Sequence, residues 1–155
     1  MEIRTANCTD IDKILLLVEQ IAKFHSDARP DWIDGKKMPV NYEFIEKCLE
    51  NNNWRIFVAE EENIIAGFCV VQINEIKEHC ILYDMTNIEI QDLCVDERYR
   101  KKGIGKKLFE NVKLFAKEKN AKFIELSVWE FNQNAKKFYE HLEMKTKINR
   151  MELRV

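Results

Sequence analysis

The chain has 155 residues, a length typical of one domain built around a single hydrophobic core. With 46% hydrophobic and 34% charged residues and only four Gly and two Pro, its composition excludes disordered and fibrous classes. The net charge of −2 provides no global field for nucleic acid or an anionic membrane, so we expect neither as a partner.

The apolar runs are too short to span a bilayer, and the first residues lack the apolar core of a signal peptide. The five cysteines are scattered, and no His lies at metal-ligand spacing from a Cys or another His. Small buried hydrophobes in a reducing compartment explain such cysteines better than disulfides do. We therefore expect a cytoplasmic protein without a bound metal.

The first half of the chain predicts two helices and several strands. Thr9 and Asp12 have the spacing of a capping box and open a helix that ends near Phe24. After a loop over residues 25–40, Asn41 is placed to cap a second helix. The strand-like runs of this half are 2–6, 54–60, 64–76 and 81–86. The second and third of these runs should pair antiparallel as a hairpin.

The run 88–95 predicts a further strand with an irregularity. Its apolar positions change parity between Ile90 and Leu93, so a regular strand cannot keep all of them on one face. One extra residue, a β-bulge near Gln91 or Asp92, would return them to the same face. A strand that is buried on both faces is the alternative.

The second half begins with the clearest helix of the chain, since residues 103–119 carry apolar positions at helical spacing. A strand at 123–129, a short helix at 134–142 and a closing strand at 144–155 follow it. A helix that crosses between two strands makes them parallel. The sum is an α+β fold, in which a mixed, mostly antiparallel sheet acquires one parallel pair and is flanked by helices.

A basic, glycine-containing loop lies at the start of the long helix. Its residues are Arg100, Lys101, Lys102, Gly103, Ile104, Gly105 and Lys106. Backbone N–H groups at a helix N-terminus attract anions, and glycines allow a phosphate to approach the backbone closely. The loop fits neither a P-loop nor a dinucleotide fingerprint. On spacing alone, a tight turn beside a solvated basic face is the preferred interpretation.

The loop, however, resembles the signature of the GNAT family, the GCN5-related N-acetyltransferases. That signature reads Gln or Arg, two residues, Gly, one residue, and Gly or Ala, which Arg100, Gly103 and Gly105 match. A second family block is matched by residues 132–142, in the family's order and separation. The resemblance implies that residues 1–155 form one N-acetyltransferase domain, with a bulged central strand and a parallel pair at the cofactor site.

The resemblance also implies acetyl-CoA as the cosubstrate, with no metal required. The pyrophosphate would lie on the basic loop from Arg100 to Lys106. The pantetheine arm would pair with the backbone of Leu93, Cys94 and Val95. Asn132 matches a position that often contacts the cofactor.

An N-acetyltransferase has to deprotonate its amine, because an alkyl amine with a pKa of about 10.4 is charged at neutral pH. Glu89 matches the glutamate base of protein-lysine members of the family, Asp92 is the nearby alternative, and many relatives use water chains instead. Tyr139 matches the tyrosine that protonates the leaving CoA thiolate, and a core aromatic is the alternative interpretation. The implied activity is direct transfer of an acetyl group to a primary amine of a small molecule or peptide.

Three further expectations follow from the resemblance. The acceptor amine would be bounded by the loop 25–40 and the segment 77–87, and homodimers are common among similar proteins. A non-catalytic acyl-CoA-binding module that senses the cofactor is the alternative function. One departure concerns Glu143, which stands where the family has Gly, and which should cost about 1 kcal/mol if the left-handed helix end is kept.

Overall fold

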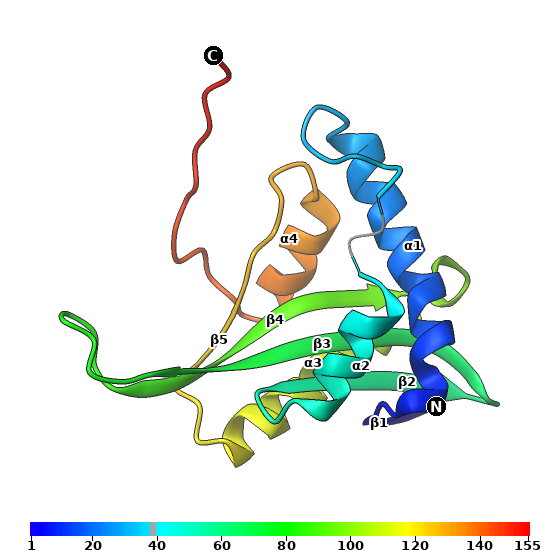
Figure 1. The fold of residues 1–155 in the computed structure, drawn as a ribbon, viewed down its shortest axis with the longest axis horizontal. Coiled ribbons are helices and arrows are strands. Elements are labelled where there is room, and N and C mark those ends of the chain that lie inside the picture. Colours follow the sequence, from blue (N-terminus) through cyan, green and yellow to red (C-terminus); the bar gives the residue numbers. More distant parts are fainter. Residues whose placement is uncertain (38–39) are drawn as a thin grey trace.

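The computed structural model of the chain describes residues 1–37 and 40–155. It is a five-stranded sheet in the order β1-β2-β3-β4-β5, with helices on both faces (Figure 1). Neighbouring strands pair antiparallel except β4 and β5, which are parallel, so the predicted α+β fold is confirmed. The helices and strands are β1 (Glu2–Thr5), α1 (Ile11–Ala28), α2 (Tyr42–Glu50), β2 (Trp54–Glu61), β3 (Ile64–Ile76), β4 (Met85–Val95), α3 (Ile104–Glu118), β5 (Phe123–Leu126) and α4 (Gln133–His141).

Each face of the sheet has its own hydrophobic core. On one face, α1 and α2 bury Ile14 and Ile45 against Phe68 of β3. On the other face, α3 buries Leu108 and Val112 against alternate residues of the same strands. Because the central strands are covered on both faces, their direction and register are tightly fixed.

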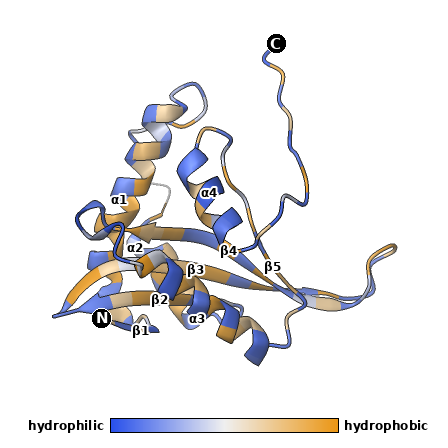
Figure 2. Cartoon of the chain, turned by 180° about the vertical axis from the view of Figure 1, so that it is seen from behind, coloured by the Kyte–Doolittle hydropathy of each residue, from blue (hydrophilic) through white to orange (hydrophobic). Residues whose placement is uncertain are grey.

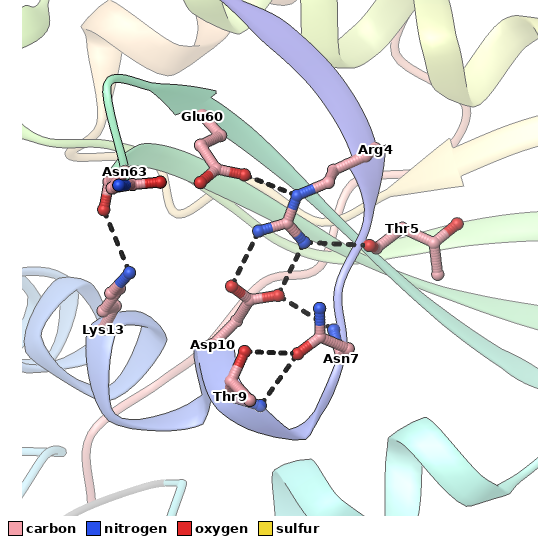
Figure 3. A network of polar contacts seen from close by, with 8 residues as sticks. All are labelled: Arg4, Thr5, Asn7, Thr9, Asp10, Lys13, Glu60 and Asn63. Carbon is pink, nitrogen blue, oxygen red and sulfur yellow. Dashed lines mark hydrogen bonds and ion pairs between the residues drawn. The ribbon is translucent and has the colours of Figure 1, made fainter.

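The N-terminus of the first helix is fixed by Asn7, so the predicted box of Thr9 and Asp12 is wrong. Asn7 Oδ1 accepts a hydrogen bond from Thr9 N at 2.8 Å, and Asp10 accepts one from Asn7 N at 2.9 Å (Figure 3). Arg4 donates to both carboxylate oxygens of the buried Asp10, at 2.7 and 2.8 Å, which holds the pKa of that carboxyl below its usual range. The two candidate boxes have equal spacing, and the tertiary partner Arg4 selects the earlier one.

β4 carries the predicted bulge. Val70 of β3 pairs with Asp92, whereas the next residue, Val71, pairs with Ile90. Gln91 is therefore the extra residue, and the apolar side chains before and after it reach the α3 face together. The bulge explains why the apolar positions of the run 88–95 change parity in the sequence.

Two predicted strands are shorter than expected. β4 begins at Met85, so residues 81–84 belong to the exposed connection from β3 rather than to the sheet. β5 ends at Leu126 instead of at residue 129, because the chain there leaves β4 and turns toward α4 (Figure 1).

The prediction of a closing strand at 144–155 is wrong, since this segment is an extended tail without strand pairing. A strand needs a neighbouring edge, and the tail runs away from the sheet (Figure 1). It contacts the body through ion pairs of Lys147 with Glu125 and of Glu152 with Arg29. Hydrophobic and hydrophilic residues both occur along the tail (Figure 2). Its exposed apolar side chains are Ile148, Met151, Leu153 and Val155.

α4 ends in a left-handed turn at Glu143, whose φ is 67°. The N–H of Glu143 donates to the carbonyl of Glu140 at 3.0 Å, and the N–H of Met144 donates to that of Tyr139 at 3.1 Å. These two bonds form a Schellman motif, which usually has Gly at the left-handed position. The geometry expected for Gly is thus kept by a residue with a Cβ.

Replacement of this residue should therefore stabilise the protein. Glu143→Gly is expected to raise the free energy of unfolding by about 1 kcal/mol, because it relieves the left-handed strain. Urea denaturation measures the change. Glu140→Gly, inside the same helix, is the matched control and should lower stability by about 1 kcal/mol. Equal losses in both variants would show that the turn is not strained.

Candidate active site

The most informative feature of the site is the separation of β4 and β5. The two strands pair only where Asn87–Ile90 lie beside Phe123–Leu126. β4 continues to Val95, so in the described chain its edge beyond the bulge has no strand neighbour on this side. Backbone groups on such an unpaired edge can bind a ligand in the manner of an added strand. This free edge contains the three residues predicted for the pantetheine arm, which are Leu93, Cys94 and Val95.

The thiol of Cys94 is not available to a ligand at this edge. Its side chain is buried against α1, where Sγ lies 3.7 Å from the carbonyl oxygen of Leu17. Burial raises the pKa of the Cys94 thiol to about 12, so it stays protonated at neutral pH. Leu93 points to the opposite face, toward α3.

The free edge leads to the N-terminus of α3. Gly103 is the N-cap, with a φ of 79°, and no side chain caps the helix. The first N–H groups of the helix are consequently open to a ligand, at its positive end. A Cβ placed on Gly103 would meet no atom within 4 Å, so the space beside this residue is empty.

Gly105 has a different role. A Cβ on this residue would lie 3.2 Å from the ring of Phe138 in α4. Ile104, between the two glycines, is buried in the core of the α3 face. The first glycine thus faces open space, whereas the second allows α4 to pack against α3.

Four predicted cationic residues surround this helix end, and all are exposed. They are Arg100, Lys101, Lys102 and Lys106. Arg100 Nε donates to the carbonyl of Val95 at 3.1 Å, which ties the loop to the end of β4. Lys102 Nζ lies 4.9 Å from the ring centre of Tyr99. Together these groups make the helix end a basic, anion-attracting surface.

α4 brings Tyr139 to the same region. The centre of its ring lies 6.2 Å from that of Phe109 and 5.0 Å from that of Phe138, so it packs as an aromatic residue against the core of the α3 face. Burial raises the pKa of Tyr139 above its usual range, which keeps the phenol protonated. Asn132 caps the helix by accepting a hydrogen bond from Ala135 N at 3.1 Å. That contact gives Asn132 a structural role, whether or not it touches a cofactor.

The two candidate bases lie in different surroundings. Glu89 accepts a hydrogen bond from Asn74 Nδ2 at 2.9 Å. Asp92 lines a cavity of about 440 Å³ beneath α1, and Glu89 is not among its lining residues. Burial raises the pKa of Asp92 to about 6, which makes it a stronger base than an exposed carboxylate.

The cavity is bounded by α1, the loop before α2, β4 and Trp129. The predicted acceptor loop 25–40 thus contributes to it, although residues 38 and 39 lie outside the described residues. The predicted segment 77–87 contributes no described lining residue. Sequence reasoning missed Trp129, because it follows the end of β5 and belongs to neither motif.

Among the described residues there is neither a metal site of clustered side chains nor a membrane-spanning helix. Within them, no group of three or more His, Cys, Asp or Glu side chains is placed to hold a metal ion. No helix in the part of the chain that the structure describes is long and apolar enough to cross a membrane.

Comparison with known proteins decides the family. The model of the Acetyltransferase (GNAT) family matches residues 21–144. The chain belongs to the GNAT family. An uncharacterized N-acetyltransferase of Archaeoglobus fulgidus is 27% identical over 146 residues, which cover 94% of the chain and 93% of that protein. A second, from the pepI 3′ region of Lactobacillus delbrueckii subsp. lactis, is 29% identical over 75 residues, or 48% of the chain and 42% of that protein.

Solved structures share this architecture over nearly the full length of the chain. A mutant of the BH1408 protein from Bacillus halodurans is 28% identical with a TM-score of 0.96, covering 100% of this chain and 99% of that one. The aminoglycoside N-acetyltransferase AAC(6′)-Iy in complex with CoA is 17% identical with a TM-score of 0.74, covering 99% and 98%. At that identity the second match concerns the fold alone.

Proposed function

We propose that this GNAT protein is an acetyl-CoA-dependent N-acetyltransferase that transfers the acetyl group directly to a primary amine. The observation that carries the proposal is the free edge of β4, which runs from the cavity beside Asp92 to the open helix end at Gly103. A thioester on this edge would have its acetyl group near the cavity and its phosphates on the helix. The CoA complex of a protein with the same fold supports acetyl-CoA as the ligand.

In this arrangement the cofactor is held mainly by backbone. Leu93, Cys94 and Val95 would pair with the pantetheine arm, as an added strand pairs with a sheet edge. The N–H groups at the start of α3 would bind the pyrophosphate, with Arg100 and Lys101 adding positive charge. Lys102, Gly103, Ile104, Gly105 and Lys106 complete the loop, and Asn132 stays a proposed cofactor contact.

The reaction requires a base on the amine side. An ammonium group in the cavity would give one proton to a carboxylate, and the neutral nitrogen would attack the thioester carbonyl carbon. Asp92 fits this role better than Glu89, because it lines the cavity. Glu89 stays the alternative, with its carboxylate already bonded to Asn74.

The leaving group requires an acid. As the carbon–sulfur bond breaks, the CoA thiolate would take the proton of the Tyr139 hydroxyl, and the second proton of the nitrogen would return to the phenolate. The products are the N-acetylated amine and CoA, with one proton passed from the carboxyl to solvent. The match of Tyr139 to the family's tyrosine supports its role as the donor, and burial keeps its phenol protonated.

Two measurements test the function. Calorimetric titration should show acetyl-CoA binding, and thiol release with a panel of amines should show transfer, with acetylated products identified by mass spectrometry. Binding without transfer to any amine would favour the alternative, a non-catalytic acyl-CoA sensing module. If acetyl-CoA does not bind, both the acetyltransferase and the acyl-CoA sensing module are excluded.

We also propose that the protein forms a homodimer. Exposed apolar side chains on the tail and on the β3–β4 connection support this, because contact with a second copy would remove their surface from water. These side chains include Ile81, Tyr83, Met151 and Leu153. Analytical ultracentrifugation of the full chain measures the oligomeric state.

The five free cysteines support a cytoplasmic location, because disulfides are rare in that reducing compartment.

A further inference from the structure

The lining of the cavity beneath α1 carries information about the acceptor. Most of its lining side chains are aliphatic or aromatic. They are Val18, Ile21, Ala22, Ile33, Val40, Trp32 and Trp129. Its volume of about 440 Å³ lies in the lower part of the range for small-molecule pockets. A ligand that fills it would therefore be small and would bury apolar surface.

Among the described charged residues that line the cavity, one carboxylate, Asp92, has no compensating cation. Asp34 lies 4.0 Å from Lys37, so these two lining charges compensate each other. Burial lowers the pKa of His25, which is therefore neutral at neutral pH. Among the described residues, Asp92 has no cationic partner, and burial alone determines its pKa. A bound ligand would thus be complementary if it carried a single cation.

The tryptophan end of the cavity is unfavourable for a cation. The guanidinium of Arg29 lies 5.4 Å from the ring centre of Trp129 and 5.8 Å from that of Trp32. Ion pairs with Asp31 and Glu152 hold Arg29 there. A second cation at this end would lose hydration against the apolar walls formed by the two tryptophans.

The aromatic wall is also held in place by packing. Trp129 stacks on Phe131 with ring centres 6.0 Å apart, and Phe131 packs 5.7 Å from Phe24 of α1. His25 lies 5.8 Å from the same ring. The tryptophan wall of the cavity is thus a preformed apolar surface.

We propose that the acceptor is a small primary amine with one positive charge on an apolar body, such as an arylalkylamine or alkylamine. The amine lies at Asp92, beside the free edge of β4, and the apolar body lies against Trp32 and Trp129. Polycationic amines and phosphorylated amino sugars do not fit, because their further charges would lose hydration against the apolar walls of the cavity. This inference rests on the proposed function and adds the substrate class.

The test compares acceptors in the thiol-release assay with saturating acetyl-CoA. For phenethylamine and hexylamine, kcat/KM should exceed the values for spermidine, kanamycin and glucosamine 6-phosphate by at least about 100-fold, since one unmatched buried charge is worth several kcal/mol. Faster transfer to a polycation, to the sugar phosphate or to a lysine-containing peptide would overturn the substrate class but keep the proposed function. Acetyl-CoA binding with no transfer to any amine would overturn both.

Two variants test whether the cavity determines the preference for amines with one charge on an apolar body. Trp32→Ala, at a residue that is 65% exposed, should raise KM about tenfold for phenethylamine, while KM for ethylamine and the affinity for acetyl-CoA stay unchanged. Tyr83→Ala, which truncates an 82% exposed aromatic side chain outside the cavity, is the matched control and should change none of them.

Ile33→Glu is the stricter test because it predicts a gain. A second carboxylate among the apolar lining should raise kcat/KM about tenfold for spermidine and lower it for phenethylamine. Unchanged ratios between these two amines in a folded Ile33→Glu protein would contradict the proposed orientation of the acceptor.

Discussion

Asp92→Asn is expected to lower kcat/KM for an accepted amine by at least about 100-fold near neutral pH, the scale of general-base catalysis. With the pKa of Asp92 at about 6, the wild-type rate should rise through that pH as the carboxyl ionises. The deficit of the variant should shrink toward pH values of about 10, where neutral amine forms without a base. A pH series of initial rates measures both features.

Glu89→Gln makes the same change of carboxylate to amide on the same strand. If Asp92 is the base, this control should retain most of the activity and the shape of the pH profile. The reverse result, with Glu89→Gln showing the shrinking deficit, would assign the base to Glu89. Tyr139→Phe should differ from both, because solvent protons replace the lost donor at low pH, so the loss is most costly at high pH.

Stability separates a functional role of Asp92 from a structural one. Its pKa is raised by folding from about 3.9 in an unfolded chain to about 6, so ionisation destabilises the folded state as the pH rises through this window. Asp92→Asn has no such charge and should unfold at a higher temperature than wild type at neutral pH. Loss of activity together with increased stability is the signature of a functional residue. A lower melting temperature would indicate a structural role instead.

The sequence predicted the architecture because its strongest signals are local. The period of the long helix, the Asn41 cap and the parity change around Gln91 all reflect interactions within one element or one strand pair. The prediction of a closing strand was wrong because strand pairing is not local. The segment 144–155 has strand-like composition, but it would need a neighbouring strand edge to pair with. The capping box at Asn7 likewise depends on Arg4, a side chain of another element, β1.

Within the site, the motifs located the loop and α4 but not the environment of each side chain. Glu89 and Asp92 are both carboxylates beside the bulge, and only the position of α1 above the sheet puts one of them in the cavity. Trp129 has no sequence signal at all. The two glycines of the motif also look equivalent in sequence, whereas one faces open space and the other faces Phe138.

This difference makes Gly103 the clean probe of the proposed phosphate site. Gly103→Asp is expected to weaken acetyl-CoA binding by more than about 100-fold, because a carboxylate about 4 Å from a phosphate costs about 4 kcal/mol at the effective dielectric constant of a protein surface. Folding should be affected little, since a Cβ there meets no atom within 4 Å and Asp tolerates the left-handed φ of 79°. Calorimetric titration with acetyl-CoA gives the affinity.

Gly103→Asn is the matched control, because it has the same size and backbone tolerance without the charge. Its loss of affinity should stay within about tenfold, so the difference between the two variants isolates electrostatics. That difference should narrow in about 1 M salt, where charges beyond about 3 Å are screened. Gly105→Ala cannot serve this purpose, since its Cβ would press on Phe138 at 3.2 Å and disturb the contact of α4 with α3. Equal affinities of wild type, Gly103→Asp and Gly103→Asn would mean that the pyrophosphate lies elsewhere, and the loop would then be only a tight turn beside a basic surface.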